Sequence, residues 1–169
     1  MNNPPYILVD ELATIVTAVK TALALPVLNY QYGYFTELNE TLNEYSKTAT
    51  YKALKFPLVW LAQPFTLRMD SPGYYSKVKV DIFIFNRTDK NLKAEDRMAN
   101  NFKPTINPIT RELLSQIAKS HVFNETVVGK IIHEETDRYF WDEVSKVFTD
   151  IVDWKILKGI ELTIKNNCP

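Results

Sequence analysis

The sequence predicts an α+β fold, a mostly antiparallel sheet with a long hairpin, packed on one side by two or more helices. Segments with alternating apolar and polar residues, which are typical of strands, follow one another in hairpins without crossover helices. Segments with apolar residues at helical spacing stand at the start and in the middle of the chain. The 169 residues are expected to form a single domain, 1–169, long enough to fold without disulfides or metals.

The first element is a helix predicted over residues 4–25. Pro4 and Pro5 suit its first turn, and Pro26 ends it. Its apolar residues fall on one narrow stripe that we expect to face the sheet: Leu8, Leu12, Ile15, Val16, Val19 and Leu23. A short strand over residues 27–33 follows, closed by Gly33.

A second helix is predicted from Thr36, its N-terminal cap, to Tyr45. Leu38, Leu42 and Tyr45 form a single docking stripe, so the Glu and Asn side chains are expected to lie in water. Residues 46–55 are expected to form an exposed connection.

Two strands come next. Residues 56–62 form a short apolar run, which is typical of a strand that is covered on both faces or lies at an interface. Residues 75–85 alternate strictly, and one face carries the expected core residues Val78, Val80, Ile82 and Ile84. On the other face, the first residues are expected to be exposed to solvent: Lys77, Lys79 and Asp81. The last two, Phe83 and Phe85, are expected to be covered.

The turn between these strands is predicted over residues 68–73, because Pro72 and Gly73 are turn residues, and it gives the hairpin a long, extended tip. After the hairpin, a short helix over residues 94–102 is expected to end at Pro104. A new helix then begins with Asn107 as its cap and Pro108 at its first position. Its buried stripe is Ile106, Ile109, Leu113 and Ile117.

The last third of the chain has a mixed pattern. Residues 122–150 are expected to form an inserted loop region, with a strand at 127–132. The chain closes with a strand over residues 154–165, where apolar and polar residues alternate again.

Composition excludes several classes of function. The 20 Lys and Arg residues balance 20 Asp and Glu residues, whereas strong sequence-independent DNA binding requires clustered positive charge. The single Cys168 cannot form an internal disulfide framework. No apolar run reaches the roughly 18 residues of a membrane span, and the first residues lack the basic leader of a signal peptide, so no membrane partner is expected.

No catalytic, cofactor-binding or metal-ligating residue is predicted. His121 and His133 do not have the spacing of a metal-ligand pair, and the acids after His133 are interpreted as a solvated loop. The four glycines are too far apart for a phosphate-binding loop. Asp81 and Glu161 are candidate acids of a metal-dependent nuclease, but Lys165 is four residues from Glu161, which is too far for the acid–lysine pattern of such sites.

Aromatic residues gather at strand ends and in loops, where tyrosine and tryptophan often meet other proteins. Two further surfaces are candidate interfaces. One is the partly apolar face of the 75–85 strand, and the other is the hairpin tip, which we expect to extend toward a neighbouring subunit. The candidate interface residues are Tyr32, Tyr34, Phe35, Arg68, Met69, Tyr74, Tyr75, Phe83, Phe85, Tyr139, Phe140 and Trp141.

Six segments carry a family resemblance: 8–23, 56–61, 77–84, 108–117, 150–156 and 159–164. In this order they resemble the tail-terminator and head–tail joining (neck) proteins of tailed bacteriophages. The Tyr-Tyr-Ser at 74–76 and the Asp-Arg-Tyr-Phe-Trp at 137–141 are also similar to structural proteins of Bacteroides-type phages or prophages.

The resemblance implies a virion protein without catalytic activity or cofactor, assembled in the host cytoplasm. Such proteins form homo-oligomeric rings of six or twelve copies that contact portal, neck or tail proteins, with DNA only as passing cargo. A closed ring requires two different adhesive faces on each subunit, and balanced charge suits packing against identical copies. The alternatives are a small metal-dependent hydrolase or nuclease with an unrecognised acidic site, and a cytoplasmic adaptor.

Overall fold

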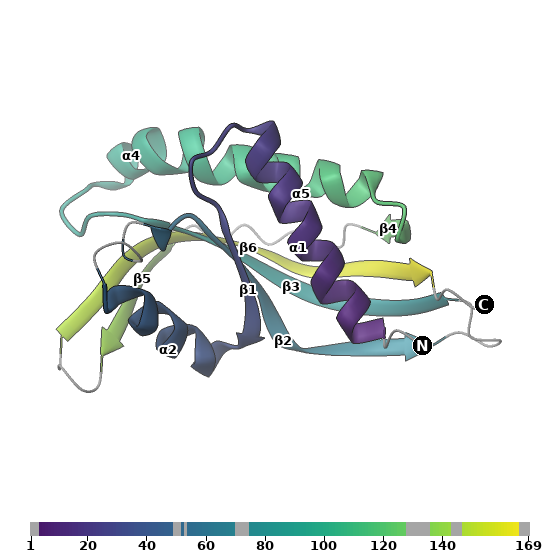
Figure 1. Cartoon of the computed structure of the whole chain (residues 1–169). Helices are drawn as coiled ribbons and strands as arrows, with labels where there is room; N and C mark the ends of the chain where they lie inside the picture. The colour runs from purple at the N-terminus through teal and green to yellow at the C-terminus, as the bar shows by residue number, and fades with distance from the viewer. Residues whose placement is uncertain are drawn as a thin grey trace.

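The structure, a computed structural model, describes residues 4–48, 52, 54–69, 75–127, 136–142 and 147–165. The strands in these ranges are β1 Asn29–Tyr34, β2 Leu58–Met69, β3 Tyr75–Arg87, β4 Phe123–Val127, β5 Thr136–Asp142 and β6 Val147–Lys165. The helices are α1 Pro4–Ala22, α2 Phe35–Ser46, α4 Ala94–Arg97, the π-helix η1 Met98–Ile106 and α5 Asn107–Lys119. Figure 1 shows their arrangement.

The described strands form one sheet in the order β1-β2-β3-β6-β4, and β5 also pairs with β6. β1 and β2 run parallel, whereas β2 with β3, β3 with β6, and β6 with β4 and β5 run antiparallel. The chain therefore has an α+β fold with a mostly antiparallel sheet, as predicted.

β6 is the longest strand and lies inside the sheet. β3 pairs with one side of it, from Arg87 opposite Val152 to Tyr75 opposite Lys165. On the other side, β5 pairs with its first half and β4 with its last residues. The expected inserted loop over 122–150 is therefore wrong for the described residues, because they contribute β4, β5 and the start of β6 to the sheet. Of the strand expected at 127–132, only Val127 lies within the described residues.

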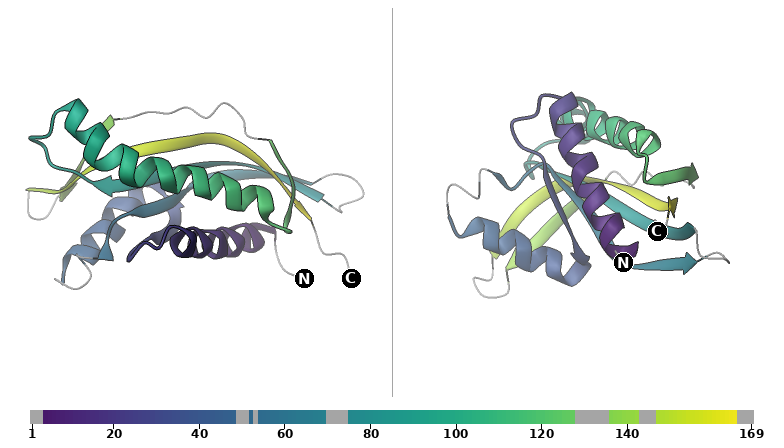
Figure 2. Two further views of the ribbon diagram at one scale, coloured as in Figure 1. Left: turned by 90° about the horizontal axis from the view of Figure 1, so that it is seen from above. Right: turned by 45° about the vertical axis from the view of Figure 1, so that its right-hand side comes forward.

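One face of the sheet is covered by α1, η1 and α5. α1 crosses the strands obliquely, and the helical run from α4 to α5 lies along β6 (Figure 2). Alternation sends the even-numbered apolar residues of β3 to this face, as predicted. The largest core lies here and includes Leu8, Leu12, Val16, Val19, Val59, Leu61, Val78, Val80, Ile82, Ile84, Ile109, Leu113, Ile117, Leu157, Ile160, Leu162 and Ile164.

The opposite face carries a second, aromatic core beneath α2, at the end of the sheet where β5 lies (Figure 1). Leu38 and Leu42 of α2 are fully buried against strand residues of that face: Leu58, Trp60, Phe85, Val152, Trp154 and Ile156. Phe83 and Trp154 stack with ring centroids 5.4 Å apart, and Phe35 meets Phe83 edge-on at the same distance. The docking stripe predicted for this helix is confirmed at both leucines, and the sheet has helices on both faces.

Several helix boundaries differ from prediction. α1 ends at Ala22 and not at residue 25. α2 begins at Phe35, with Tyr34 and not Thr36 at its N-cap. The reason is that the Glu37 carboxylate accepts a hydrogen bond from the Tyr34 N–H at 2.7 Å, which closes the first turn one residue earlier. Pro104 does not end a helix, because α4, η1 and α5 form a continuous run. The wider turns of a π-helix accommodate a residue that lacks an N–H.

Two connections also differ from prediction. Arg68 and Met69 belong to β2, opposite Lys77 and Ser76, so the long hairpin tip predicted over 68–73 is not shown. The turn residues 70–74 lie outside the described residues. The connection over 46–55 is not exposed throughout, because Lys55 is only 2% exposed.

Both neighbours of β3 bulge at the same level. β2 carries extra residues between Ala62 and Thr66, including Pro64, which suits a bulge because it cannot donate to a ladder. β6 carries one extra residue between Leu157 and Ile160. There Gly159 has a φ of +71°, in the left-handed region that favours glycine, and its N–H donates to Asp81 Oδ1 at 2.7 Å. The side-chain alternation of β6 reverses at this point.

Gly159→Ala is expected to lower the free energy of unfolding by about 1–2 kcal/mol, because a Cβ is strained at positive φ. The added methyl would also lie 3.0 Å from Lys79 Cε. Urea unfolding followed by circular dichroism measures the change. Ala24→Gly is the matched control, since Ala24 also has a positive φ, of 49°, and loses its Cβ. That control should not be destabilised, and an unchanged Gly159→Ala protein would contradict the role given to the bulge.

Candidate functional site

The bulged region carries a groove of about 830 Å³ on the sheet face that α2 leaves open. β2, β3 and β6 all contribute to its lining. Its charged side chains are Arg68, Lys77, Lys79, Lys158, Asp81 and Glu161, and we call it the charged groove. Among the described lining residues, four cationic against two anionic side chains leave a net charge of two positive.

Among the described residues, the cations of the charged groove outnumber its acids. Arg68, Lys77, Lys79 and Lys158 form no salt bridge within the described part of the chain. Arg68 and Lys77 are direct cross-strand partners, and like charges in that position destabilise a sheet. The arrangement therefore costs stability in the isolated subunit and favours an anionic partner.

The two acids in the groove have different surroundings. Asp81 accepts the Gly159 N–H and so holds the bulge, whereas Glu161 lies opposite Lys79 in the register. Among the described residues, no group of three His, Cys, Asp or Glu side chains is placed to hold a metal ion. His133 lies outside the described residues.

The aromatic candidates are distributed over separate parts of the sheet. Tyr32 and Tyr34 are 47% and 51% exposed on the edge strand β1, and Tyr75 is 39% exposed on the same face as Lys77. Phe35 and Phe83 are half-buried in the aromatic core. Phe85 is fully buried, so it is a core residue in this subunit and offers no surface to a partner.

The remaining candidates are only partly placed. Arg68 is exposed in the charged groove, and Met69 is the last residue of β2. Tyr74 lies outside the described residues. The cluster Tyr139, Phe140 and Trp141 lies in β5, which pairs with β6, and the structure does not describe its side chains. The structure thus brings Tyr32 and Tyr34 together on β1, and it packs Phe35, Phe83 and Phe85 together in the aromatic core.

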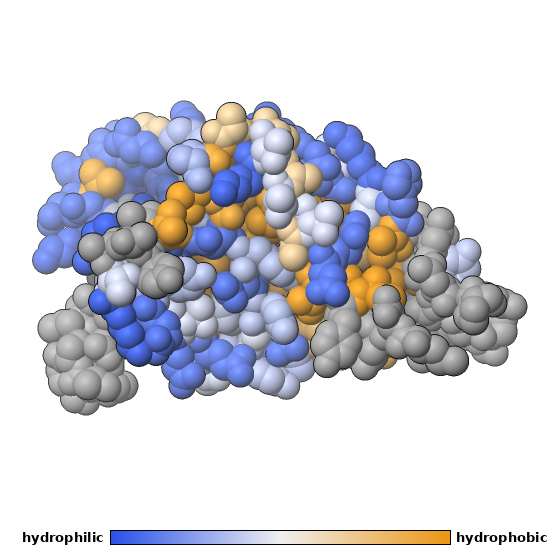
Figure 3. Space-filling view, viewed as in Figure 1, coloured by the Kyte–Doolittle hydropathy of each residue, from blue (hydrophilic) through white to orange (hydrophobic). Residues whose placement is uncertain are grey.

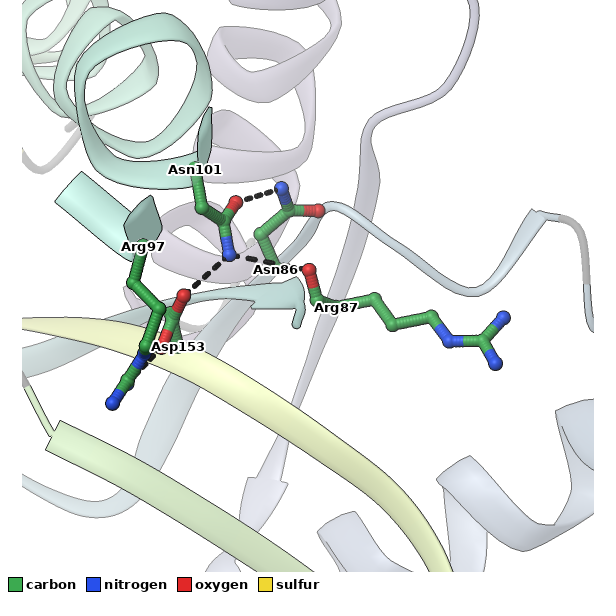
Figure 4. A network of polar contacts seen from close by, with 5 residues as sticks. All are labelled: Asn86, Arg87, Arg97, Asn101 and Asp153. Carbon is green, nitrogen blue, oxygen red and sulfur yellow. Dashed lines mark hydrogen bonds and ion pairs between the residues drawn. The ribbon is translucent and has the colours of Figure 1, made fainter. Parts of the chain in front are cut away.

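A buried polar network joins η1 to the centre of the sheet (Figure 4). Asp153 is fully buried and forms an ion pair with Arg97, whose Nε donates to Asp153 Oδ1 at 2.6 Å. Asn101 Nδ2 donates to Asp153 Oδ2 at 2.6 Å and to the Arg87 carbonyl at 3.1 Å, while Asn86 Nδ2 donates to Asn101 Oδ1. These bonds satisfy both carboxylate oxygens and position the π-helix, so this network is structural.

A second buried ion pair joins Lys55, just before β2, to Asp150 of β6. Lys55 Nζ donates to Asp150 Oδ2 and also to Ser46 Oγ, at 2.6 Å, at the end of α2. Burial lowers the pKa of Lys55 and raises the pKa of Asp150, in each case more strongly than the partner charge opposes it. The pair thus fixes the connection at an electrostatic cost.

Sequence reasoning did not find these charged sites. Lys77 and Lys79 were recognised only as a wet strand face, and Lys158 had no assigned role. The one available signal is the pair of cations Lys77 and Lys79 on one face of the strand. The partners of Asp150 and Asp153 lie far away in the chain, and no local pattern points to them.

The chain matches no model of a known protein family and no curated protein sequence. No described helix combines the length and apolar character that crossing a membrane requires.

Lys55→Met and Asp150→Leu are each expected to lower the free energy of unfolding by about 3–5 kcal/mol, because each leaves one buried charge unpaired. The double variant is expected to be as stable as the wild type or more stable. Chemical denaturation of the wild type, the two single variants and the double variant gives a double-mutant cycle. If the double variant lost as much free energy of unfolding as the two single variants together, the pairing would be contradicted.

The pH dependence of this pair provides a further check. Because the pKa of Asp150 is raised, the folded state holds that proton more tightly, and the carboxyl's contribution to stability falls as pH rises above 3.8. Because the pKa of Lys55 is lowered, the contribution of its amine to stability rises as pH approaches 10.5. The stability of the double variant relative to wild type should therefore be greatest between these limits, as measured by denaturation at several pH values.

Asp153→Ala is expected to destabilise the protein by about 3–5 kcal/mol, because it leaves the Arg97 guanidinium without its buried partner. Arg87→Ala, whose exposed side chain can be removed while its carbonyl remains bonded to Asn101, is the matched control. Thermal unfolding monitors both variants. Equal melting temperatures for them would contradict the central role of Asp153.

Proposed function

We propose that this chain is a structural protein that assembles with copies of itself into a ring, without catalysis, at the head–tail junction of a tailed phage. In that role it would be a tail terminator or a neck ring, located in the virion and assembled in the host cytoplasm. Portal, neck or tail proteins would be its other partners, with DNA only as passing cargo.

The single observation that carries the proposal is the exposed pair Tyr32 and Tyr34 on β1. β1 is the edge strand next to β2, and alternate residues place both rings on the same side of it. An edge strand with exposed tyrosines offers both backbone groups and large contact area to another protein. The charged groove is a second, different surface, and a ring needs two different surfaces on each subunit.

The purified protein is expected to form rings of six or twelve copies, visible by negative-stain microscopy and measured by light scattering. Replacing Tyr32 and Tyr34 together by Ser should raise the concentration for half-assembly at least ten-fold, about 1.4 kcal/mol. Leu54→Ser, which changes another exposed apolar residue, 41% exposed, is the matched control. A wild-type protein that stays monomeric, alone and with candidate portal or tail partners, would contradict the proposal.

A further inference from the structure

The outward side of α2 carries an acidic stripe. Glu37, Glu40 and Glu44 are exposed and follow one another at helical spacing, on a side of the helix away from the buried Leu38 and Leu42. This outward side is hydrophilic in Figure 3. We call these three residues the acidic stripe. With Lys47 as the neighbouring cation, it has a net charge of two negative.

The acidic stripe retains binding capacity in the isolated subunit. Glu44 pairs with Lys47, but both side chains are about two-thirds exposed, and such surface pairs contribute little. The Glu37 carboxylate accepts a hydrogen bond from the Tyr34 N–H and so helps to cap the N-terminus of α2. Glu40 forms no ion pair within the described part of the chain.

The charged groove is the complement of this stripe. Both surfaces belong to the same face of the sheet, since α2 covers the half around Phe85 and Trp154 while the groove occupies the half around Lys77 and Lys79. They therefore lie side by side in one subunit and cannot bind each other there. The net charges, two positive and two negative, are equal and opposite.

The two surfaces also match in length. α2 has 12 residues and is about 18 Å long at 1.5 Å per residue. The groove follows β3 from Lys77 to Asp81, which pair with Arg68 and Ala62, and this spans about 13 Å at 3.3 Å per residue. The acidic stripe from Glu37 to Glu44 spans about 10 Å at 1.5 Å per residue. A helix of this size can therefore place its whole acidic stripe along the groove.

We propose that α2 of one copy docks in the charged groove of the next copy, head to tail. This inference rests on the proposed ring and names one of its interfaces. The contact joins two different surfaces, so it is heterologous and can be repeated around a closed ring. It would neutralise Arg68 and Lys77, two cations that lie directly opposite each other on β2 and β3.

A nucleic-acid backbone fits the groove less well. Asp81 and Glu161 line it together with the cations and would repel a continuous row of phosphates. The chain as a whole has no net positive charge to attract a polyanion from a distance. An acidic helix that brings its own Lys47 can instead satisfy charges of both signs.

Charge reversal tests the docking. Variant one carries Glu40→Lys and Glu44→Lys, and variant two carries Lys77→Glu and Lys79→Glu; Glu37 is retained because it caps α2. Each variant alone is expected to assemble at least ten-fold more weakly than wild type in light scattering at low salt. An equimolar mixture is expected to regain assembly, because each reversed helix then meets a reversed groove. Circular dichroism confirms that both variants fold.

Controls with the same charge changes lie on the helical layer of the other sheet face. Lys103→Glu with Lys119→Glu matches variant two, and Glu95→Lys with Asp96→Lys matches variant one; all four residues are exposed. These proteins are expected to assemble like wild type, which shows that the effect depends on position and not on net charge.

The outcomes separate the two proposals. If wild type forms rings and variants one and two form them equally well, or if the mixture stays dissociated, the docking is wrong while the ring stands. If wild type itself never assembles, the proposed function fails as well. A duplex DNA oligonucleotide that binds wild type but not variant two, with assembly unchanged, would also overturn the docking and assign the groove to nucleic acid.

Discussion

The antiparallel pairing of β3 with β6 determines where the other elements can lie. Its register sets Phe85 opposite Trp154 and Val78 opposite Leu162. Successive side chains of each strand point to opposite faces of the sheet. The helical face receives aliphatic residues along its whole length. The other face receives aromatic residues at one end and charged residues at the other, which explains why α2 covers only one half of it.

The bulges at Pro64 and Gly159 allow β2 and β6 to run through the whole sheet while their apolar side chains still point to the correct face. Without the extra residue in β6, the alternation would turn Ile160, Leu162 and Ile164 away from the helical core. Asp81 holds this bulge from β3, between the two bulged neighbours. The same local irregularity thus preserves the large core and shapes the charged groove beneath it.

Features set by short-range pattern could be predicted from the sequence, including α1, β3, the end of β6 and the α+β class. The continuous helix through Pro104 could not, because η1 depends on Asn101 meeting Asp153 and Arg87, which are distant or lie on another element. The burial of Lys55 was missed for the same reason, since Asp150 lies 95 residues away. For the candidate site, exposed Tyr32 and Tyr34 were among the predicted residues, whereas Lys158 reaches the groove only through the bulge.

The position of β6 in the sheet has a consequence for how the chain folds. This strand is internal, yet it comes last among the described elements and pairs with β3, β4 and β5. Until it has left the ribosome, Leu38 and Leu42 lack their partners Val152, Trp154 and Ile156, and Asn101 lacks Asp153. Closing such long-range pairings is slow compared with local helix formation. The subunit therefore completes its fold only after synthesis of β6, and a nascent chain shorter than that has no finished sheet to offer a neighbour.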